Sequence, residues 1–216
     1  MKERPILFSG PMVRAILSGT KTQTRRVVKC HILDHGAGKY GRQNIVPMKP
    51  CPYGQPGDRL WVREQHCLLD VVKSHVSGMS LGPENNNERV PDTWNLTIEY
   101  SDGTERDTSV EGERPKQTRE RGDIGWRPSI HMPRWACRLV LEVVSVRVER
   151  LQDMHHKTGE FLAEGVVMPP NELYPDINTS DKLERHFIKL WNSINAKRAP
   201  WASNPLVWVV EFRRLP

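Results

Sequence analysis

The feature that most constrains the fold is a short apolar helix pattern that ends at a glycine and leads directly into a basic segment. Apolar residues recur there at helical spacing, at Met12, Val13, Ile16 and Leu17. Pro11 suits the first helical turn, and Gly19 suits the position just after the last turn. We therefore predict a helix that stops at Gly19, then a polar turn, then a strand that begins at Val27 and Val28.

The expected polar turn gathers groups capable of chemistry within six residues. It carries one lysine, two threonines and two arginines, namely Lys21, Thr22, Thr24, Arg25 and Arg26. These side chains suit an anion-binding site or a site with an activated nucleophile. The alternative is a solvated basic turn, because short charge runs usually lie on the surface.

Three segments carry a resemblance to a known family. Residues 16–25, Ile-Leu-Ser-Gly-Thr-Lys-Thr-Gln-Thr-Arg, resemble the signature of the ASCH family, a branch of the PUA-like superfamily. Residues 57–64 and 205–212 resemble two strands of the same family, and the layout is most similar to ASCH-like proteins of phages and prophages. The resemblance covers about two thirds of the chain and implies fold more specifically than function.

The fold implied by this resemblance is α+β, a PUA-like β-barrel with flanking helices. It implies a single domain over residues 1–216, with a large loop-rich insertion at about 68–125. An insertion of this kind is capable of covering one mouth of the barrel.

The resemblance also implies a chemistry. Some ASCH proteins are small amidohydrolases that release the acyl group from N4-acetylcytidine, with a lysine, a threonine three positions later, and a glutamate on a later helix. Carried over by motif, the catalytic residues are Lys21, Thr24 and Glu164, without a cofactor or metal. A threonine nucleophile needs a base, and a lysine serves as one when its pKa is lowered. Lys21 and Glu164 both stay open as the group that takes the proton.

A second hypothesis is an RNA- or DNA-binding module, or a nuclease, without amidohydrolase activity. PUA-like domains commonly bind RNA, and the net charge of +6 with a pI near 9.3 permits a polyanionic partner. RNA is the more expected nucleic acid. The ligand-binding candidates are Thr22, Arg25, Arg26, Trp61, Arg63, Glu64, Trp126, Arg127 and Trp135. A third hypothesis is a phage interaction protein that uses the barrel only as a scaffold.

The chain departs from the small amidohydrolases in length, in the insertion and in the basic pair Arg25-Arg26. These departures favour a larger or charged substrate, such as a nucleotide or a nucleic acid. The expected partner is thus a nucleoside, nucleotide or nucleic acid, bound through its nucleobase.

Periodicity and turn residues predict the remaining elements. We expect strands at 5–8, 59–64, 93–100, 136–150 and 206–212, and helices at 156–164 and from Ser180 or Asp181 to Ile194. Ser145 marks a bend or bulge in the strand at 136–150. The expected inner faces are Trp94, Leu96, Ile98 and Tyr100 on the strand at 93–100, and Leu183, Phe187, Leu190 and Trp191 on the last helix. Residues 68–76 fit a strand or a helix. Loops are expected at 30–56, 82–91 and 168–180, and residues 105–125 are expected to stay mobile or to lie on the surface.

The Trp- and Arg-rich segment 126–135 fits two interpretations equally. Its aromatic and basic residues suit stacking on a base and binding a phosphate, and they also suit a buried plug that closes the barrel. Ser129 and His131 are not favoured as a nucleophile–base pair, because side chains two residues apart need not meet.

The cysteines and the ends of the chain give expectations about compartment. Cys30, Cys51, Cys67 and Cys137 form no Cys-x-x-Cys pair, so free thiols are expected and a zinc ribbon is not. A site combining Cys30 with His31, His35 and Cys51 matches no standard zinc spacing. No signal peptide or long apolar run is evident, so a cytoplasmic location is expected, including that of a phage-infected or lysogenic bacterial cell.

Overall fold

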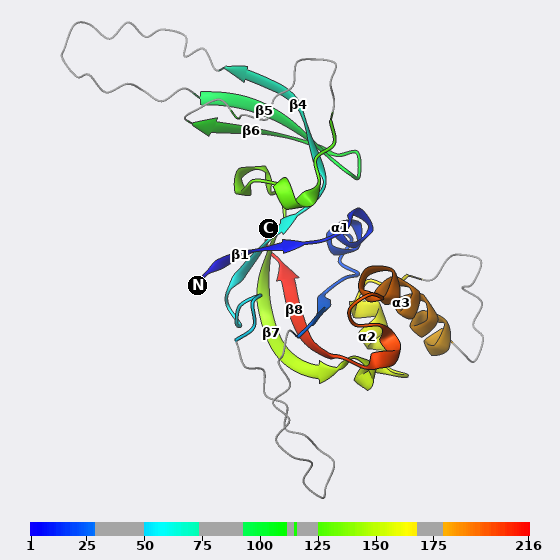
Figure 1. Cartoon of the computed structure of the whole chain (residues 1–216). Helices are drawn as coiled ribbons and strands as arrows, with labels where there is room; N and C mark the ends of the chain where they lie inside the picture. Colours follow the sequence, from blue (N-terminus) through cyan, green and yellow to red (C-terminus); the bar gives the residue numbers. More distant parts are fainter. Residues whose placement is uncertain (29–49, 74–92, 112–114, 116–124, 168–178) are drawn as a thin grey trace, which may run out of the picture. The chain divides into compact units, whose positions relative to one another are not determined.

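The computed structural model describes residues 1–28, 50–73, 93–111, 115, 125–167 and 179–216 (Figure 1). These residues form an α+β structure with a five-stranded sheet and a three-stranded sheet. The chain separates into two compact units, one made of residues 1–6, 11–61 and 139–216, the other of residues 7–10 and 62–138. Within the described ranges the strands form no closed barrel. None of the helices in the described ranges is both long and apolar enough to span a membrane.

The five-stranded sheet has the order β1-β3-β7-β8-β2. Its strands are β1 (Glu3–Leu7), β3 (Arg59–Arg63), β7 (Val140–Arg150), β8 (Leu206–Arg214) and β2 (Gln23–Val27). The long antiparallel pair of β7 and β8 contains the bulge expected near Ser145, where the register shifts between Val143 and Ser145. β2 lies at the edge and pairs antiparallel with β8, with Thr24 opposite Val210. This edge position leaves one side of β2 available to neighbouring elements.

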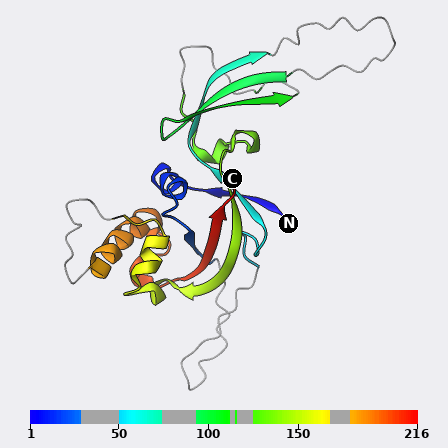
Figure 2. The ribbon, with the colours of Figure 1, turned by 180° about the vertical axis from the view of Figure 1, so that it is seen from behind.

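The described residues contain three α-helices. They are α1 (Gly10–Leu17), α2 (Thr158–Ala163) and α3 (Thr179–Asn195). Figure 2 shows α2 and α3 side by side next to β8. The core between them is apolar and consists of Leu151, Met154, Phe161, Val166, Leu183, Phe187, Trp191, Val207 and Val209. This core fixes the end of α2 against the sheet.

The face of α3 differs in one respect from expectation. Leu183, Phe187 and Trp191 are buried as predicted, because they repeat every four residues along the helix. Leu190, also expected on the inner face, is 36% exposed because it lies at the margin of that stripe. Its exposed part faces a pocket described below.

The second unit contains the three-stranded sheet β4-β5-β6, formed by β4 (His66–Lys73), β5 (Thr93–Tyr100) and β6 (Glu105–Glu111). The predicted inner face of β5 is confirmed for Leu96, Ile98 and Tyr100, which are buried, whereas Trp94 is only half-buried. The ambiguous segment 68–76 is a strand as far as Lys73.

The prediction that the segment from 105 onward stays mobile or lies on the surface is confirmed in part for residues 105–111, which lie at the surface but form strand β6. These residues pair along their length with β5, from Glu105 opposite Glu99 to Glu111 opposite Thr93. Their side chains are mostly exposed, and an edge strand with a solvated face tolerates polar residues at most positions. A low apolar content therefore did not exclude a strand.

Glycines and prolines end the elements largely as the sequence predicts. Helix α1 stops before Gly19, and the turn before β3 contains Gly57, each with positive φ. The proline-flanked segment 126–135 forms 3-10 turns at Ser129–His131 and Arg134–Ala136.

Several predicted segments lie outside the described residues. They are the loop expected at 82–91, most of the loops expected at 30–56 and 168–180, and Cys30, His31 and His35 of the zinc pattern that the sequence did not favour. Cys51, Cys67 and Cys137 are free thiols, as expected.

Candidate active site

The segment after α1 is attached to the end of α2 by backbone hydrogen bonds. The Lys21 N–H donates to the Ala15 carbonyl over 3.0 Å, and the Thr22 N–H donates to the Ala163 carbonyl over 2.9 Å. Lys21 and Glu164 form an isolated antiparallel bridge. This pairing draws Lys21 out of solvent, so that only 2% of the residue is exposed.

The expected polar turn is shorter than predicted. The strand was expected to begin at Val27, but β2 already begins at Gln23, so Thr24, Arg25 and Arg26 lie on a strand. The reason is pairing with β8, which starts where the Phe212 N–H donates to the Thr22 carbonyl. A strand fixes the directions of these side chains more tightly than a solvated turn would.

Lys21 and Glu164 form a buried ion pair. The Lys21 Nζ donates to the Glu164 Oε2 over 3.0 Å and to the Glu164 backbone carbonyl over 2.7 Å. Glu164 is the C-cap of α2, where the helix dipole favours a cation and disfavours a carboxylate. The lysine ammonium therefore offsets the unfavourable position of this carboxylate.

Arg25 holds the other oxygen of the same carboxylate. Its Nη1 donates to the Glu164 Oε1 over 3.0 Å, while its Nη2 contacts the Glu160 Oε2 at 2.5 Å and the Glu149 Oε2 at 3.5 Å. The Gln23 Nε2 also donates to the Glu160 Oε2, over 2.8 Å. The two Glu164 oxygens are thus each bound by a different cation, which fixes the orientation of the carboxylate.

The surroundings of Lys21 favour the neutral amine more than solvent does for an exposed lysine. Burial lowers the pKa of the Lys21 ammonium, the nearby Glu164 carboxylate raises it, and the guanidinium groups of Arg26 and Arg25 lower it further. The net direction is downward from 10.5. Burial also lowers the pKa of Arg26. A lysine in this environment is a better candidate base than a solvated one.

A pocket of about 220 Å³ lies beside this ion pair, within the unit that contains β2 and α3. One part of its wall is polar and comes largely from β2 and Glu164, and the other is mainly apolar and comes from α1 and α3. The lining residues are Met12, Thr24, Arg25, Arg26, Val27, Tyr53, Glu164, Phe187, Leu190, Trp191, Ile194 and Asn195. Thr24 and Glu164 therefore border a common space.

The structure brings the residues predicted from the amidohydrolase resemblance together in two pairs, Lys21 with Glu164 and Glu164 with Thr24, while Lys21 itself does not line the pocket. Glu164 contacts Lys21 directly, and Thr24 borders the pocket beside it. Arg25 and Arg26 border the same pocket, whereas Thr22 is exposed and does not line it. Sequence reasoning missed the carboxylates Glu149 and Glu160 that bind Arg25. It also missed the pocket wall contributed by α3, although the apolar stripe on that helix was visible.

The other predicted ligand-binding residues do not line this pocket. They are Trp61, Arg63, Glu64, Trp126, Arg127 and Trp135. Glu64 is buried and accepts two hydrogen bonds from Arg138, whose guanidinium also lies 3.9 Å from the centre of the Tyr100 ring. Trp135 is half-buried and packs against a small core of the second unit, while Trp126 is 42% exposed. Glu64 and Trp135 therefore have evident structural roles.

Gly165 controls how closely Lys21 approaches α2. Its φ is +78°, and a Cβ there would lie 2.9 Å from the Lys21 Cβ and 3.1 Å from the Ala15 Cβ. We expect Gly165→Ala to lower the free energy of unfolding by about 1–3 kcal/mol, because it combines left-handed backbone strain with a clash. Urea unfolding of the purified variants would measure this.

Gly159→Ala is the matched control for this substitution. Gly159 lies in α2, and an added Cβ there meets nothing within 4 Å. Alanine at this position should leave stability unchanged or raise it by up to about 1 kcal/mol. Equal destabilisation by the two alanines would show that the close approach at Gly165 does not matter.

Comparisons of the chain with models of protein families, with curated proteins and with solved structures gave no match.

Proposed function

We propose that the pocket bordered by Thr24 and Glu164 is the active site of an amidohydrolase that deacylates an N4-acylated cytosine. The observation that carries this proposal is the buried ion pair of Lys21 with Glu164, beside a pocket that Thr24 and Glu164 both line. A lysine with a lowered pKa close to a potential nucleophile is a common feature of active sites. Ion pairs with a purely structural role also perturb pKa values, so the pocket beside this ion pair is what distinguishes it as a candidate active site.

The pocket suits a nucleobase better than a polymer. Its volume of about 220 Å³ is small for a ligand site, which favours one ring with a short substituent. Phe187 and Trp191 offer aromatic surface to a planar ring, and Thr24, Glu164 and the arginines offer polar contacts at the opposite wall. These walls support a substrate with a flat ring and a polar, hydrolysable edge.

The proposed reaction uses Thr24 as the nucleophile. The Thr24 Oγ1 attacks the amide carbonyl carbon, and its proton moves to the neutral Lys21 Nζ. The C–N4 bond then breaks, the leaving N4 amine takes that proton, and the acyl group stays on Thr24 as an ester. Water hydrolyses the ester, with Lys21 accepting a proton from water and returning it to Thr24. Atoms and protons balance without a cofactor.

Glu164 has a positioning role in this scheme. Its Oε2 and backbone carbonyl both hold the lysine, and Arg25 holds its Oε1. Because Arg25 is bound by three carboxylates, its guanidinium is better suited to fixing Glu164 than to binding a substrate phosphate. Arg26, which lines the pocket, is the better candidate to stabilise the oxyanion that forms on the carbonyl oxygen.

The proposed fold assignment is an ASCH-type, PUA-like domain. The support is the order of a short helix, a glycine with positive φ, the Lys-Thr-x-Thr-x-Arg segment and an edge strand, set in an α+β structure with a five-stranded sheet. The strands of the described ranges form no closed barrel, so a closed barrel is not part of this proposal.

The test is an ultraviolet assay of the purified protein with N4-acetylcytidine. We expect loss of the absorbance of the acylated base, together with release of acetate and cytidine. Absence of turnover by protein with a folded circular-dichroism spectrum would contradict the proposal. Binding of single-stranded RNA that weakens steeply with salt, and is lost in Arg26→Ala, would then favour the nucleic-acid-binding module.

A further inference from the structure

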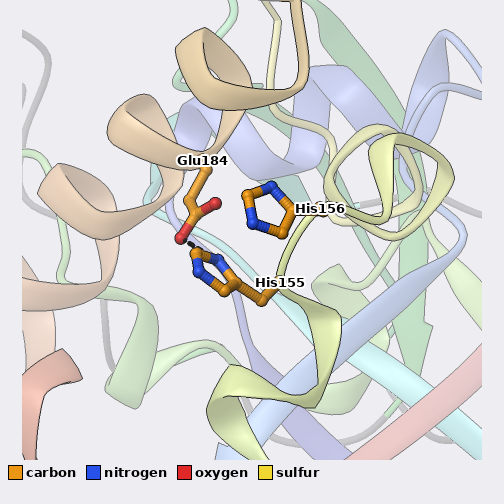
Figure 3. A group of neighbouring side chains, drawn as sticks. All are labelled: His155, His156 and Glu184. Carbon is orange, nitrogen blue, oxygen red and sulfur yellow. Dashed lines mark ion pairs between the residues drawn. The ribbon is translucent and has the colours of Figure 1, made fainter.

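A second cluster of reactive side chains shares no residue with the Lys21–Glu164 ion pair or the pocket, and it does not depend on the proposed function. His155 and His156 follow the 3-10 turn Leu151–Met154 at the end of β7, and Glu184 projects from α3 toward them (Figure 3). One ligand atom from each of the three residues lies within 4.8 Å of the others. The two imidazole rings stack, with their centroids 4.1 Å apart.

The burial of this cluster is asymmetric. Glu184 is only 6% exposed, while the side chains of His155 and His156 are 54% and 69% exposed. The Glu184 Oε1 lies 2.6 Å from the His155 Nδ1. A buried carboxylate requires a cationic or hydrogen-bonding partner, and here that partner is a solvent-accessible imidazole. The anionic side of the cluster is thus fixed by the protein, and the imidazole side is open to entry from solvent.

The backbone holds the second histidine in an uncommon conformation. His156 has a φ of 57°, in the left-handed region that non-glycine residues rarely adopt. In this conformation its ring stacks on His155, and its Nδ1 lies 3.7 Å from the Asp181 Oδ1, one helical turn before Glu184. This distance is longer than a hydrogen bond, so Asp181 adds negative charge beside the His156 ring without fixing the orientation of the ring.

We propose that His155, His156 and Glu184 form a Zn²⁺ site with a fourth position open to water. Two imidazoles and one carboxylate are an established zinc ligand set. In a tetrahedral zinc site with ligand distances of about 2.1 Å, ligand atoms lie about 3.4 Å apart. At present the His155 Nδ1 lies 2.6 Å from the Glu184 Oε1, and the ligand atoms of the group lie within 4.8 Å of one another. Rotation of the two exposed imidazoles therefore has to widen the shortest contact as well as close the longer gaps. The ion replaces the proton that the His155–Glu184 contact otherwise requires.

A metal at this position would connect the end of β7 to α3. The same helix contributes Phe187 and Trp191 to the core and to the pocket wall. Because the ion binds the folded arrangement of ligands from two elements, it should raise the thermal unfolding temperature. The rise in unfolding temperature should increase with zinc concentration.

The test is isothermal titration of untagged, metal-free protein with ZnCl2, alongside His155→Ala and His156→Ala. We expect each single variant to bind zinc at least about tenfold more weakly at one site. The variant that carries both substitutions should bind one zinc ion fewer per chain than wild type. His131→Ala, which removes an exposed histidine elsewhere, is the control and should bind zinc as wild type does. Both target histidines are exposed, so folding should persist and is checked by circular dichroism.

X-ray absorption at the zinc edge distinguishes this site from a cysteine site. The expected spectrum of the ion lost in the double variant shows nitrogen and oxygen ligands with imidazole scattering and no sulfur. Unchanged affinity and stoichiometry in the double variant would overturn the proposal, as would sulfur ligation of that ion. A zinc-induced rise in unfolding temperature that persists in the double variant would also overturn it.

Discussion

Replacing Glu164 with alanine is expected to lower the free energy of unfolding by about 3–5 kcal/mol. The Glu164 carboxylate binds the ammonium of Lys21 and the guanidinium of Arg25, and the side chains of both cations are 1% exposed. Its removal leaves two buried positive charges with fewer partners, and desolvated charges without partners are costly. Urea unfolding at pH 7, followed by circular dichroism, would measure the loss.

Glu142→Ala is the matched control for this measurement. Glu142 also pairs with an arginine, but Arg213 is 67% exposed, so the pair lies at the surface. Its loss should cost no more than about 1 kcal/mol. Similar losses for Glu142→Ala and Glu164→Ala would contradict the account of Glu164 as the centre of a buried charge network.

The second large effect concerns turnover of N4-acetylcytidine. Lys21→Met should lower kcat by about 10²–10⁴-fold, the usual range for loss of a general base. Thr24→Val should lower kcat at least as far, because it keeps the shape of the side chain and removes the nucleophilic oxygen. Thr20→Val is the control, since the Thr20 hydroxyl donates to the Ala15 carbonyl at the surface. It should leave kcat unchanged.

The pH dependence of kcat tests the protonation state of Lys21. Only the neutral amine accepts the Thr24 proton, so kcat should rise with pH, with a midpoint below the ordinary lysine value of 10.5. The Glu164 carboxylate raises the pKa of Lys21, so Glu164→Gln should move the midpoint to lower pH. A midpoint that moves upward in Glu164→Gln, or a rate that falls as pH rises, would contradict a lysine base.

Much of the local structure could be predicted from the sequence, because short-range signals determine it. The apolar spacing from Met12 to Leu17 gave helix α1, and alternation gave β5 and β7. Ser145 marked the bulge. Strand β6 was missed because its stability comes from pairing with β5 and not from apolar residues.

The candidate site could be predicted only in part, because its contacts join distant parts of the chain. Lys21 and Thr24 follow from one short motif, and Glu164 followed from a looser resemblance. The contact between Lys21 and Glu164 joins residues 143 positions apart, which no local pattern encodes. The same holds for Arg25 with Glu160 and for His155 with Glu184. Such pairs depend on how α2 and α3 pack on β8.

The most direct test of the central claim is detection of an acyl group on Thr24. Wild-type protein is mixed with excess N4-acetylcytidine, quenched in acid during turnover, and analysed by intact-mass and peptide mass spectrometry. The account predicts one acetyl group per chain on the peptide that contains Thr24, and none in Thr24→Val. Turnover without an acyl group on Thr24, or with the acyl group on another residue, would contradict it.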